Sequence, residues 1–303
     1  MKNCLFCGRI LPPKRVKVGG KSDEHIVARW LLEHLEIGAT TITPGHLNVR
    51  SGETIQTRHH TLNNFVGGSV CRDCNSGWMS ELESQAKPIL EALIADPHRL
   101  STLKKAERRI VARWTFKTAA IFNRSSSYGN PEIAPSHPVP DRHLRVLKDG
   151  GIPDDVAVLA GGSTCDRPFD FFQGDNWGAP EDGFPLQSED QKDSYKIGLS
   201  FRDLLLAVVF FPNPAYHYAV VQPVYYPLWG GARGVVPFRG EMDKSPSFSG
   251  SPIIEGFVRT IAVVSKAYWE LRENEARTRL VIPAGVIGRP TEHLEVAYYD
   301  GRD

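Results

Sequence analysis

Two Cys-x2-Cys knuckles constrain the fold of this chain more than any other feature of its sequence. The first pairs Cys4 with Cys7, and the second pairs Cys71 with Cys74. Paired knuckles of this spacing are typical of a tetrahedral zinc site whose four thiolates hold a small module together. The segment between them is longer than in a zinc ribbon, so a sizeable insert must fold there. We therefore expect a structural Zn²⁺ that does no chemistry itself.

The cysteines also indicate where the protein works. The fifth cysteine, Cys165, has no partner in the sequence, so the other four are the metal-binding set. No secretory signal precedes the first knuckle, and thiols in this pattern are typical of a reducing compartment. The longest apolar run, residues 204–211, is too short to cross a bilayer. We expect a cytoplasmic protein with no membrane partner.

The insert carries residue types that suit phosphodiester hydrolysis. Glu24 and His25 are adjacent, and Asn75 directly follows the second knuckle. Histidine suits the general base because its pKa lies near neutrality, and carboxylate and amide oxygens suit Mg²⁺ or Mn²⁺. Neighbouring residues of a strand point to opposite faces, so two catalytic neighbours require a bent or bulged backbone, or one of them works from its edge. A lone Glu-His pair is more often an ordinary surface pair, but the enclosing knuckles and Asn75 favour catalysis here.

The order Cys-x2-Cys, Glu-His-Ile, Cys-x2-Cys-Asn resembles the zinc-containing branch of the HNH endonucleases, which have the ββα-metal fold. The resemblance covers roughly the first 85 residues. It implies that His25 is the general base and that Glu24 and Asn75 bind one divalent cation. It also implies that Asn64, or its neighbour Asn63, orients the histidine.

The metal ligand of this motif is commonly aspartate, whereas this chain has Asp23 followed by Glu24. Either carboxylate is therefore a candidate ligand for the catalytic Mg²⁺ or Mn²⁺.

Cationic side chains outside the motif are candidates for contact with a phosphate backbone. Arg58, His59 and His60 lie between the motif and the second knuckle, where they would contact the scissile phosphate or supply another metal ligand. A solvated loop is the simpler interpretation of these three. A helix expected over residues 102–123 also carries a row of like charges at i+4 spacing, and DNA would relieve their repulsion. This row consists of Lys105, Arg109, Arg113 and Lys117. A solvated basic face is the competing interpretation.

The chain has 303 residues, which exceeds the usual size of a single domain. We predict the α+β class, with a zinc-stapled HNH-like ββα-metal module over residues 1–96. A larger, helix-led α+β domain of unknown fold would span 97–303 and serve recognition, oligomerisation or regulation. Within it, the apolar run 204–211 predicts a buried strand or helix end, and the pattern of 258–274 predicts a helix.

Together these observations predict a divalent-metal-dependent endonuclease that hydrolyses DNA, with duplex DNA as its partner. Phage defence or restriction would suit such an enzyme, and a homodimer or a partner protein would engage the larger domain. Two alternatives stay open. One is a non-catalytic zinc module that binds nucleic acid or protein, and the other is an RNA-cleaving toxin. Net charge does not separate them, because the formal value is +1.

Overall fold

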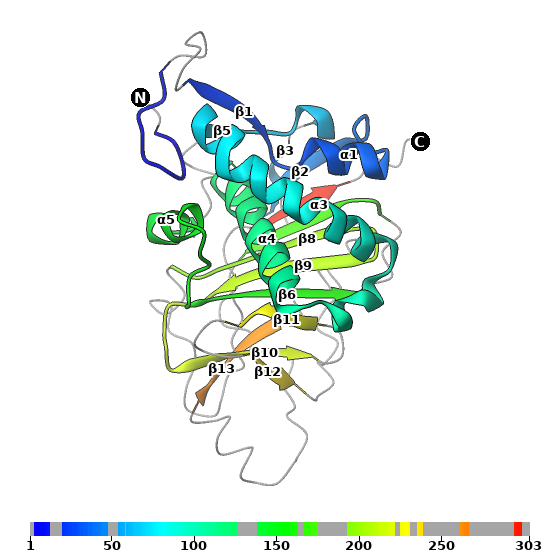
Figure 1. The fold of residues 1–303 in the computed structure, drawn as a ribbon, viewed down its shortest axis with the longest axis vertical. Helices are drawn as coiled ribbons and strands as arrows, with labels where there is room; N and C mark the ends of the chain where they lie inside the picture. The colour runs from blue at the N-terminus through cyan, green and yellow to red at the C-terminus, as the bar shows by residue number, and fades with distance from the viewer. Residues whose placement is uncertain are drawn as a thin grey trace.

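The computed structural model of this chain combines helices with extensive antiparallel sheet, in agreement with the expected α+β class (Figure 1). It describes residues 3–12, 20–47, 54–57, 59–125, 138–162, 167–174, 193–221, 225–230, 235–238, 261–266 and 294–298. No helix within these ranges is both long and apolar enough to cross a membrane.

The N-terminal part alternates short strands with helices. Its strands are β1 (Lys21–His25), β2 (Thr41–Leu47), β3 (Thr54–Thr57), β4 (His60–Thr61) and β5 (Val66–Cys71). Its helices are α1 (Arg29–Leu35), the 3-10 turn η1 (Leu62–Asn64), α2 (Arg72–Cys74), the π-helical turn η2 (Asn75–Met79) and α3 (Ser80–Ala95). The segments α2, η2 and α3 are contiguous from the second knuckle onward. The backbone at Gly77 is not helical, so a kink there separates the first turns from α3.

The remainder of the chain is led by helices and continues with strands. Its helices are η3 (Pro97–Thr102), α4 (Lys105–Ser125) and α5 (Asp141–Lys148). Its strands are β6 (Val156–Gly162), β7 (Asp170–Gly174), β8 (Tyr195–Phe201), β9 (Leu204–Phe210), β10 (Tyr216–Val221), β11 (Tyr225–Trp229), β12 (Val235–Phe238), β13 (Ile261–Ser265) and β14 (Leu294–Tyr298).

Nine of the described strands form one large sheet. Its order is β11-β6-β9-β8-β7-β14-β2-β3, with β4 joined to β2, and the neighbouring strands run antiparallel. Strand β9 is buried along its whole length, and helix α4 covers one of its two faces (Figure 1). This confirms the strand alternative for the apolar run at 204–211.

Strand β14 joins the two ends of the chain within this sheet. It pairs with β2 on one side and with β7 on the other. Described buried side chains from both sides of residues 96 and 97 also belong to one hydrophobic cluster. The division into two domains at this point stays a prediction, and the core that the structure describes runs across it.

Helix α4 connects the N-terminal strands to the large sheet. Its buried face includes Trp114, Phe116 and Phe122, and it packs against α3 and against strands of the sheet. Helix α4 also contacts β5, whose backbone approaches the helix at Gly67. A Cβ atom at this position would lie 2.6 Å from a side-chain carbon of Ile121. A side chain at this position would push the strand away from the helix, so glycine permits the close contact.

Part of one expected helix is a strand. The pattern over 258–274 predicted a helix, but β13 (Ile261–Ser265) pairs antiparallel with β10. Its sequence, Ile-Ala-Val-Val-Ser, is rich in β-branched residues, and the paired strand overrides the helical spacing. Positions 267–274 lie outside the described residues.

Candidate functional site

The four knuckle cysteines converge on one point. Their sulfur atoms all lie within 4.8 Å of one another, and the sulfurs of Cys7 and Cys71 are 3.7 Å apart. Four thiolates bound to one ion at about 2.3 Å place their sulfurs about 3.8 Å apart. The first knuckle closes through a hydrogen bond from Gly8 N to Cys4 O, with Gly8 at φ +71°. The cluster therefore has the spacing that a metal ion requires.

The hydrogen bonds of the cluster also suit a bound cation. Backbone N–H groups donate to the sulfurs of Cys4 and Cys71, at 3.3 and 3.4 Å. A hydrogen bond with Cys74 lowers the pKa of Cys4 to about 4, and the same contact raises the pKa of Cys74. Without a metal ion, these contacts favour ionisation of the Cys4 thiol and oppose ionisation of the Cys74 thiol. A cation would offset the repulsion among four thiolates, so the donor set fits a structural metal ion.

Beside this cluster, β1 and β5 position the predicted catalytic pair. The strands are antiparallel, with a bulge between Ser22 and Glu24. The Glu24 side chain points into the protein and is 9% exposed, whereas His25 is half-buried. Because the bulge precedes Glu24, the two neighbours still alternate as strand residues do. The backbone of Asp23 lies in β1, but its side chain falls outside what the structure describes.

A main-chain carbonyl orients His25. Its Nε2 lies 3.1 Å from Asn63 O in the turn η1. A carbonyl oxygen accepts only, so Nε2 carries the proton and Nδ1 is the basic nitrogen of the neutral ring. The predicted orienter Asn64 instead donates to Thr61 Oγ1 at 2.8 Å and is exposed. The contact to the histidine therefore comes from Asn63, through its backbone.

Asn75 lies within the first helical turns that follow the second knuckle. Cys71 is the N-cap of α2, because its sulfur accepts a hydrogen bond from Cys74 N. The amide of Asn75 donates from Nδ2 to Ser22 Oγ on β1. The Asn75 side chain is also close enough to Glu24 to lower the pKa of that carboxyl group. Two of the predicted metal ligands are thus neighbours in the fold.

Lys117 corrects one of our expectations. We placed it in the phosphate-contacting row of α4, but its side chain is fully buried. Its Nζ lies 2.6 Å from Glu83 Oε1 and 3.7 Å from Glu24 Oε1. At 3.6 residues per turn, a row at i+4 rotates by about 40° per step, so Lys117 lies about 120° around the helix from Lys105. That rotation carries it from the surface to the interior.

Burial and charge act in opposite directions on Glu24. Burial raises the pKa of this carboxyl group, and the positive charge of Lys117 partly offsets the effect. The nearby Glu83 raises the pKa of Glu24 further. Glu24 therefore depends on a nearby cation to hold its negative charge in the interior.

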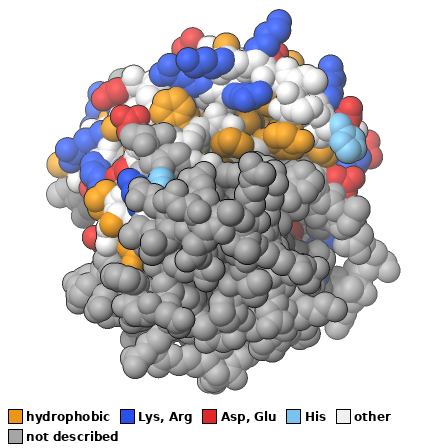
Figure 2. Space-filling model, turned by 90° about the horizontal axis from the view of Figure 1, so that it is seen from below, with side chains coloured by type: hydrophobic (Ala, Val, Ile, Leu, Met, Phe, Trp, Pro, Cys, Tyr) orange, Lys and Arg blue, Asp and Glu red, His pale blue; other side chains and the backbone are white. Residues whose placement is uncertain are grey.

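The other predicted nucleic-acid contacts are dispersed. Lys105 and Arg109 are exposed on α4, whereas Arg113 is half-buried and donates to Leu147 O at 3.0 Å. His59 is exposed, His60 is half-buried in β4, and Arg58 lies outside the described residues. On the face in Figure 2, described basic side chains are interspersed with acidic and apolar ones. That view shows no uninterrupted basic surface among the described residues.

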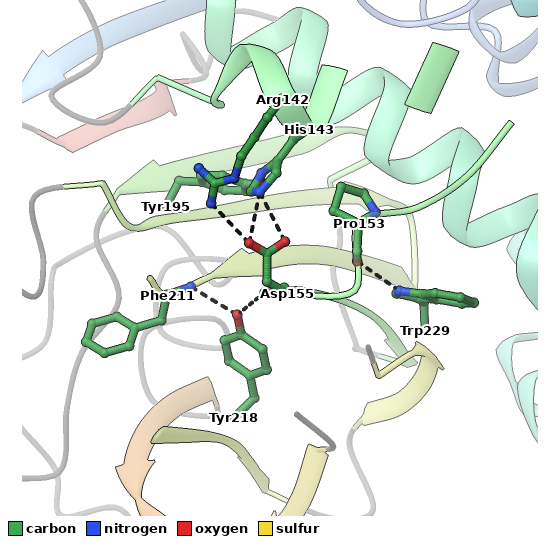
Figure 3. A network of polar contacts seen from close by, with 8 residues as sticks. All are labelled: Arg142, His143, Pro153, Asp155, Tyr195, Phe211, Tyr218 and Trp229. Carbon is green, nitrogen blue, oxygen red and sulfur yellow. Dashed lines mark hydrogen bonds and ion pairs between the residues drawn. The ribbon is translucent and has the colours of Figure 1, made fainter. Parts of the chain in front are cut away.

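A second polar network, which we did not predict, lies between α5, the starts of β6 and β8, and β10 (Figure 3). His143 Nδ1 is 3.0 Å from the hydroxyl of Tyr195, and its Nε2 is 3.1 Å from Asp155 Oδ1. Arg142 pairs with the same carboxylate at 3.0 Å, and Tyr218 donates to Asp155 O at 2.7 Å. These residues are far apart in sequence, so spacing gave no signal for them.

The exposure of this network argues against catalysis. A catalytic Asp-His pair presents its imidazole to the substrate and keeps the carboxylate behind it. Here the order is reversed, because the His143 side chain is 2% exposed and that of Asp155 is 31% exposed. The ring of Phe210 also packs against the imidazole, with centroids 4.6 Å apart. The network therefore connects α5 to the sheet.

Replacing Asp155 with asparagine is expected to lower stability at pH 7 by about 1–2 kcal/mol. Burial opposes ionisation of Asp155, but hydrogen bonds and charge from His143, together with Arg142, outweigh it and lower the pKa to about 2. This carboxylate therefore stabilises the fold fully above about pH 4, and the contribution is lost as pH falls toward 2. Urea unfolding at several pH values measures it.

The exposed Asp149 provides a matched control for this test, since its side chain is 74% exposed and pairs with Lys148 only at 3.9 Å. Asp149→Asn should change stability little at any pH. A loss in Asp155→Asn that is the same at pH 7 and at pH 2.5 would contradict the assigned role of the carboxylate.

Comparison with models of known families, with curated proteins and with solved structures found no match to this chain. Its function therefore has to follow from the four-cysteine cluster and the residues beside it.

Proposed function

We propose that this chain is a divalent-metal-dependent endonuclease of the HNH type that hydrolyses DNA phosphodiester bonds. The four-cysteine cluster would hold a structural Zn²⁺ and keep β1 and β5 together. The observation that carries the proposal is the arrangement around His25. The histidine ends one strand of an antiparallel pair, a carbonyl on η1 fixes its tautomer, and the partner strand runs directly into a helix.

In the proposed reaction, Nδ1 of His25 accepts a proton from the attacking water. The hydrogen bond from Nε2 to Asn63 O keeps the ring in the required tautomer and stabilises the imidazolium that forms. Glu24 and His25 alternate on β1, and His25 is the last residue of that strand, so the histidine would act from the end of the strand. The water then attacks phosphorus in line with the leaving 3′ oxygen, the bond between phosphorus and that oxygen breaks, and the leaving oxygen takes a proton from solvent.

Glu24 and Asn75 are the proposed ligands of the catalytic Mg²⁺ or Mn²⁺. Their side chains are neighbours, since Asn75 lowers the pKa of Glu24, and they offer a carboxylate and an amide oxygen. Mg²⁺ typically uses one or two carboxylates and completes its shell with water and substrate phosphates, so this small donor set fits it. When bound, the ion would neutralise charge that develops on the scissile phosphate.

Exposed cations supply the proposed DNA contacts. Lys105 and Arg109 on α4 and His59 before β4 are accessible, as phosphate binding requires. Because one module nicks one strand, we propose that double-strand cleavage requires two protomers. Mass measurement on the DNA-bound protein would reject this if the cleaving species held a single chain.

A non-catalytic zinc module that binds nucleic acid or protein is the second candidate. The ion pair between Lys117 and Glu24 favours it, since one proposed metal ligand already has a cationic partner. Under this alternative, the buried charges serve only to attach α4 to the N-terminal strands.

Incubation of the full chain with supercoiled plasmid separates these functions. With Mg²⁺ or Mn²⁺ we expect nicked circles that accumulate with time and vanish in EDTA. Competing single-stranded RNA tests the substrate, because preferential RNA cleavage would favour an RNA-cleaving toxin. Tight DNA binding without cleavage in either metal would instead favour the non-catalytic module.

A further inference from the structure

The Lys117 ammonium lies where a cation would be needed beside Glu24. It comes from α4, which follows the segment that resembles a nuclease, and it reaches carboxylates on two other elements. Glu83 on α3 is 2.6 Å from Nζ, and Glu24 on β1 is 3.7 Å from it. The side chain of Glu83 is 23% exposed and that of Lys117 is fully buried. One internal cation therefore serves two acidic groups in a largely dry environment.

A divalent cation at Glu24 would have to share this environment with the ammonium. Like charges a few ångströms apart repel strongly in a low-dielectric interior. Without the ammonium, the buried Glu24 and the partly buried Glu83 would lose this counter-ion. Such an arrangement is costly, and a divalent cation would relieve it. The lysine thus affects metal binding through charge, without touching the substrate.

We propose that the Lys117 ammonium competes with the catalytic divalent cation for the Glu24 carboxylate, so that α4 holds the site in a low-affinity state. This inference rests on the proposed function, because it takes Glu24 as the ligand of that ion. It makes Lys117 a residue that sets the affinity of the site for metal.

A purely structural ion pair makes a different prediction. If Lys117 only attaches α4 to the N-terminal strands, its removal lowers stability and leaves divalent-metal binding at Glu24 unchanged. If it competes with the metal, its removal strengthens that binding. Metal affinity, measured separately from activity, distinguishes the two.

The test is a titration of the zinc-loaded full chain with Mn²⁺, followed by electron paramagnetic resonance of the free ion. Lys117→Met is expected to bind Mn²⁺ roughly tenfold to a hundredfold more tightly than the wild type. Adding Glu24→Gln to this variant should abolish the gain. Lys87→Met is the matched control, since Lys87 lies on α3 with its side chain 48% exposed and pairs with Glu91. Its Mn²⁺ affinity should equal that of the wild type.

A second variant addresses loss of folding. Lys117→Met combined with Glu83→Gln removes one positive and one negative charge together, so the buried site keeps its net charge. This double variant should still bind Mn²⁺ more tightly than the wild type, because the competing ammonium is gone. Wild-type affinity in a folded Lys117 variant overturns the inference.

Plasmid nicking separates this inference from the proposed function. If the wild type nicks with Mn²⁺ but Lys117→Met binds the ion no more tightly than the wild type, the competition by Lys117 is wrong and the proposed nuclease function is retained. If Lys117→Met gains a Glu24-dependent Mn²⁺ site but neither the wild type nor any variant nicks DNA, the competition by Lys117 is supported and the proposed nuclease function is rejected.

Discussion

Replacing His25 with alanine is expected to slow plasmid nicking by roughly 10²–10⁴-fold, which is the usual contribution of a general base. The side chain is half-buried, and its contact to Asn63 O joins a turn to a strand without filling the core. The fold should therefore survive the change. Initial rates of nicking, measured beside thermal unfolding of the same samples, check both parts.

His98 supplies the control for this substitution. It is an exposed histidine in η3, outside the proposed site, and His98→Ala should nick at the wild-type rate. Retained Mn²⁺ binding in His25→Ala would show that the base and the metal ligands are separate groups. Nicking by His25→Ala at the wild-type rate would remove the histidine from the mechanism.

Replacing Cys74 with serine is expected to lower the free energy of unfolding by more than about 4 kcal/mol, the range typical of a lost metal site. All four cysteines lie in or against the hydrophobic cluster that also contains residues of α4 and the large sheet. Loss of the metal should therefore destabilise the cooperative unit and extend beyond the first knuckle. Chelation of the wild type should produce the same shift.

The measurement combines thermal unfolding with metal analysis of the purified chain. We expect about one Zn²⁺ per wild-type chain and a large loss in Cys74→Ser. Cys165→Ser is the matched control, because this cysteine lies outside both knuckles in the sequence, and it should retain the full zinc content. Equal zinc content in Cys74→Ser and the wild type would contradict a four-thiolate site.

Local spacing explains what the sequence could predict. The knuckle cysteines meet because a Cys-x2-Cys turn places both sulfurs on one side, and such turns depend on few neighbours. The buried strand β9 was one of two alternatives for an unbroken apolar run. These features are visible within a few consecutive residues.

Contacts between distant segments determine the features that the sequence could not predict. Helical rotation moved Lys117 from an expected surface row to the interior, where Glu24 and Glu83 receive it. Strand β13 has a helix-compatible pattern and is fixed only by its partner β10. The turn that orients His25 does so through a backbone carbonyl, and every residue type has one. A local sequence pattern does not show which distant residue a side chain or strand will contact.

The place of β14 in the large sheet has a consequence for how the protein is made. Strand β2 is synthesised early, but its neighbour β14 leaves the ribosome last among the described strands. At 5–20 residues per second, a typical rate of translation, this edge of β2 stays unpaired for roughly ten seconds or more before β14 has been synthesised. An open strand edge is prone to pair with other nascent chains. Early closure of the four-cysteine cluster, which needs nothing beyond the second knuckle, would hold β1 and β5 in register during that wait.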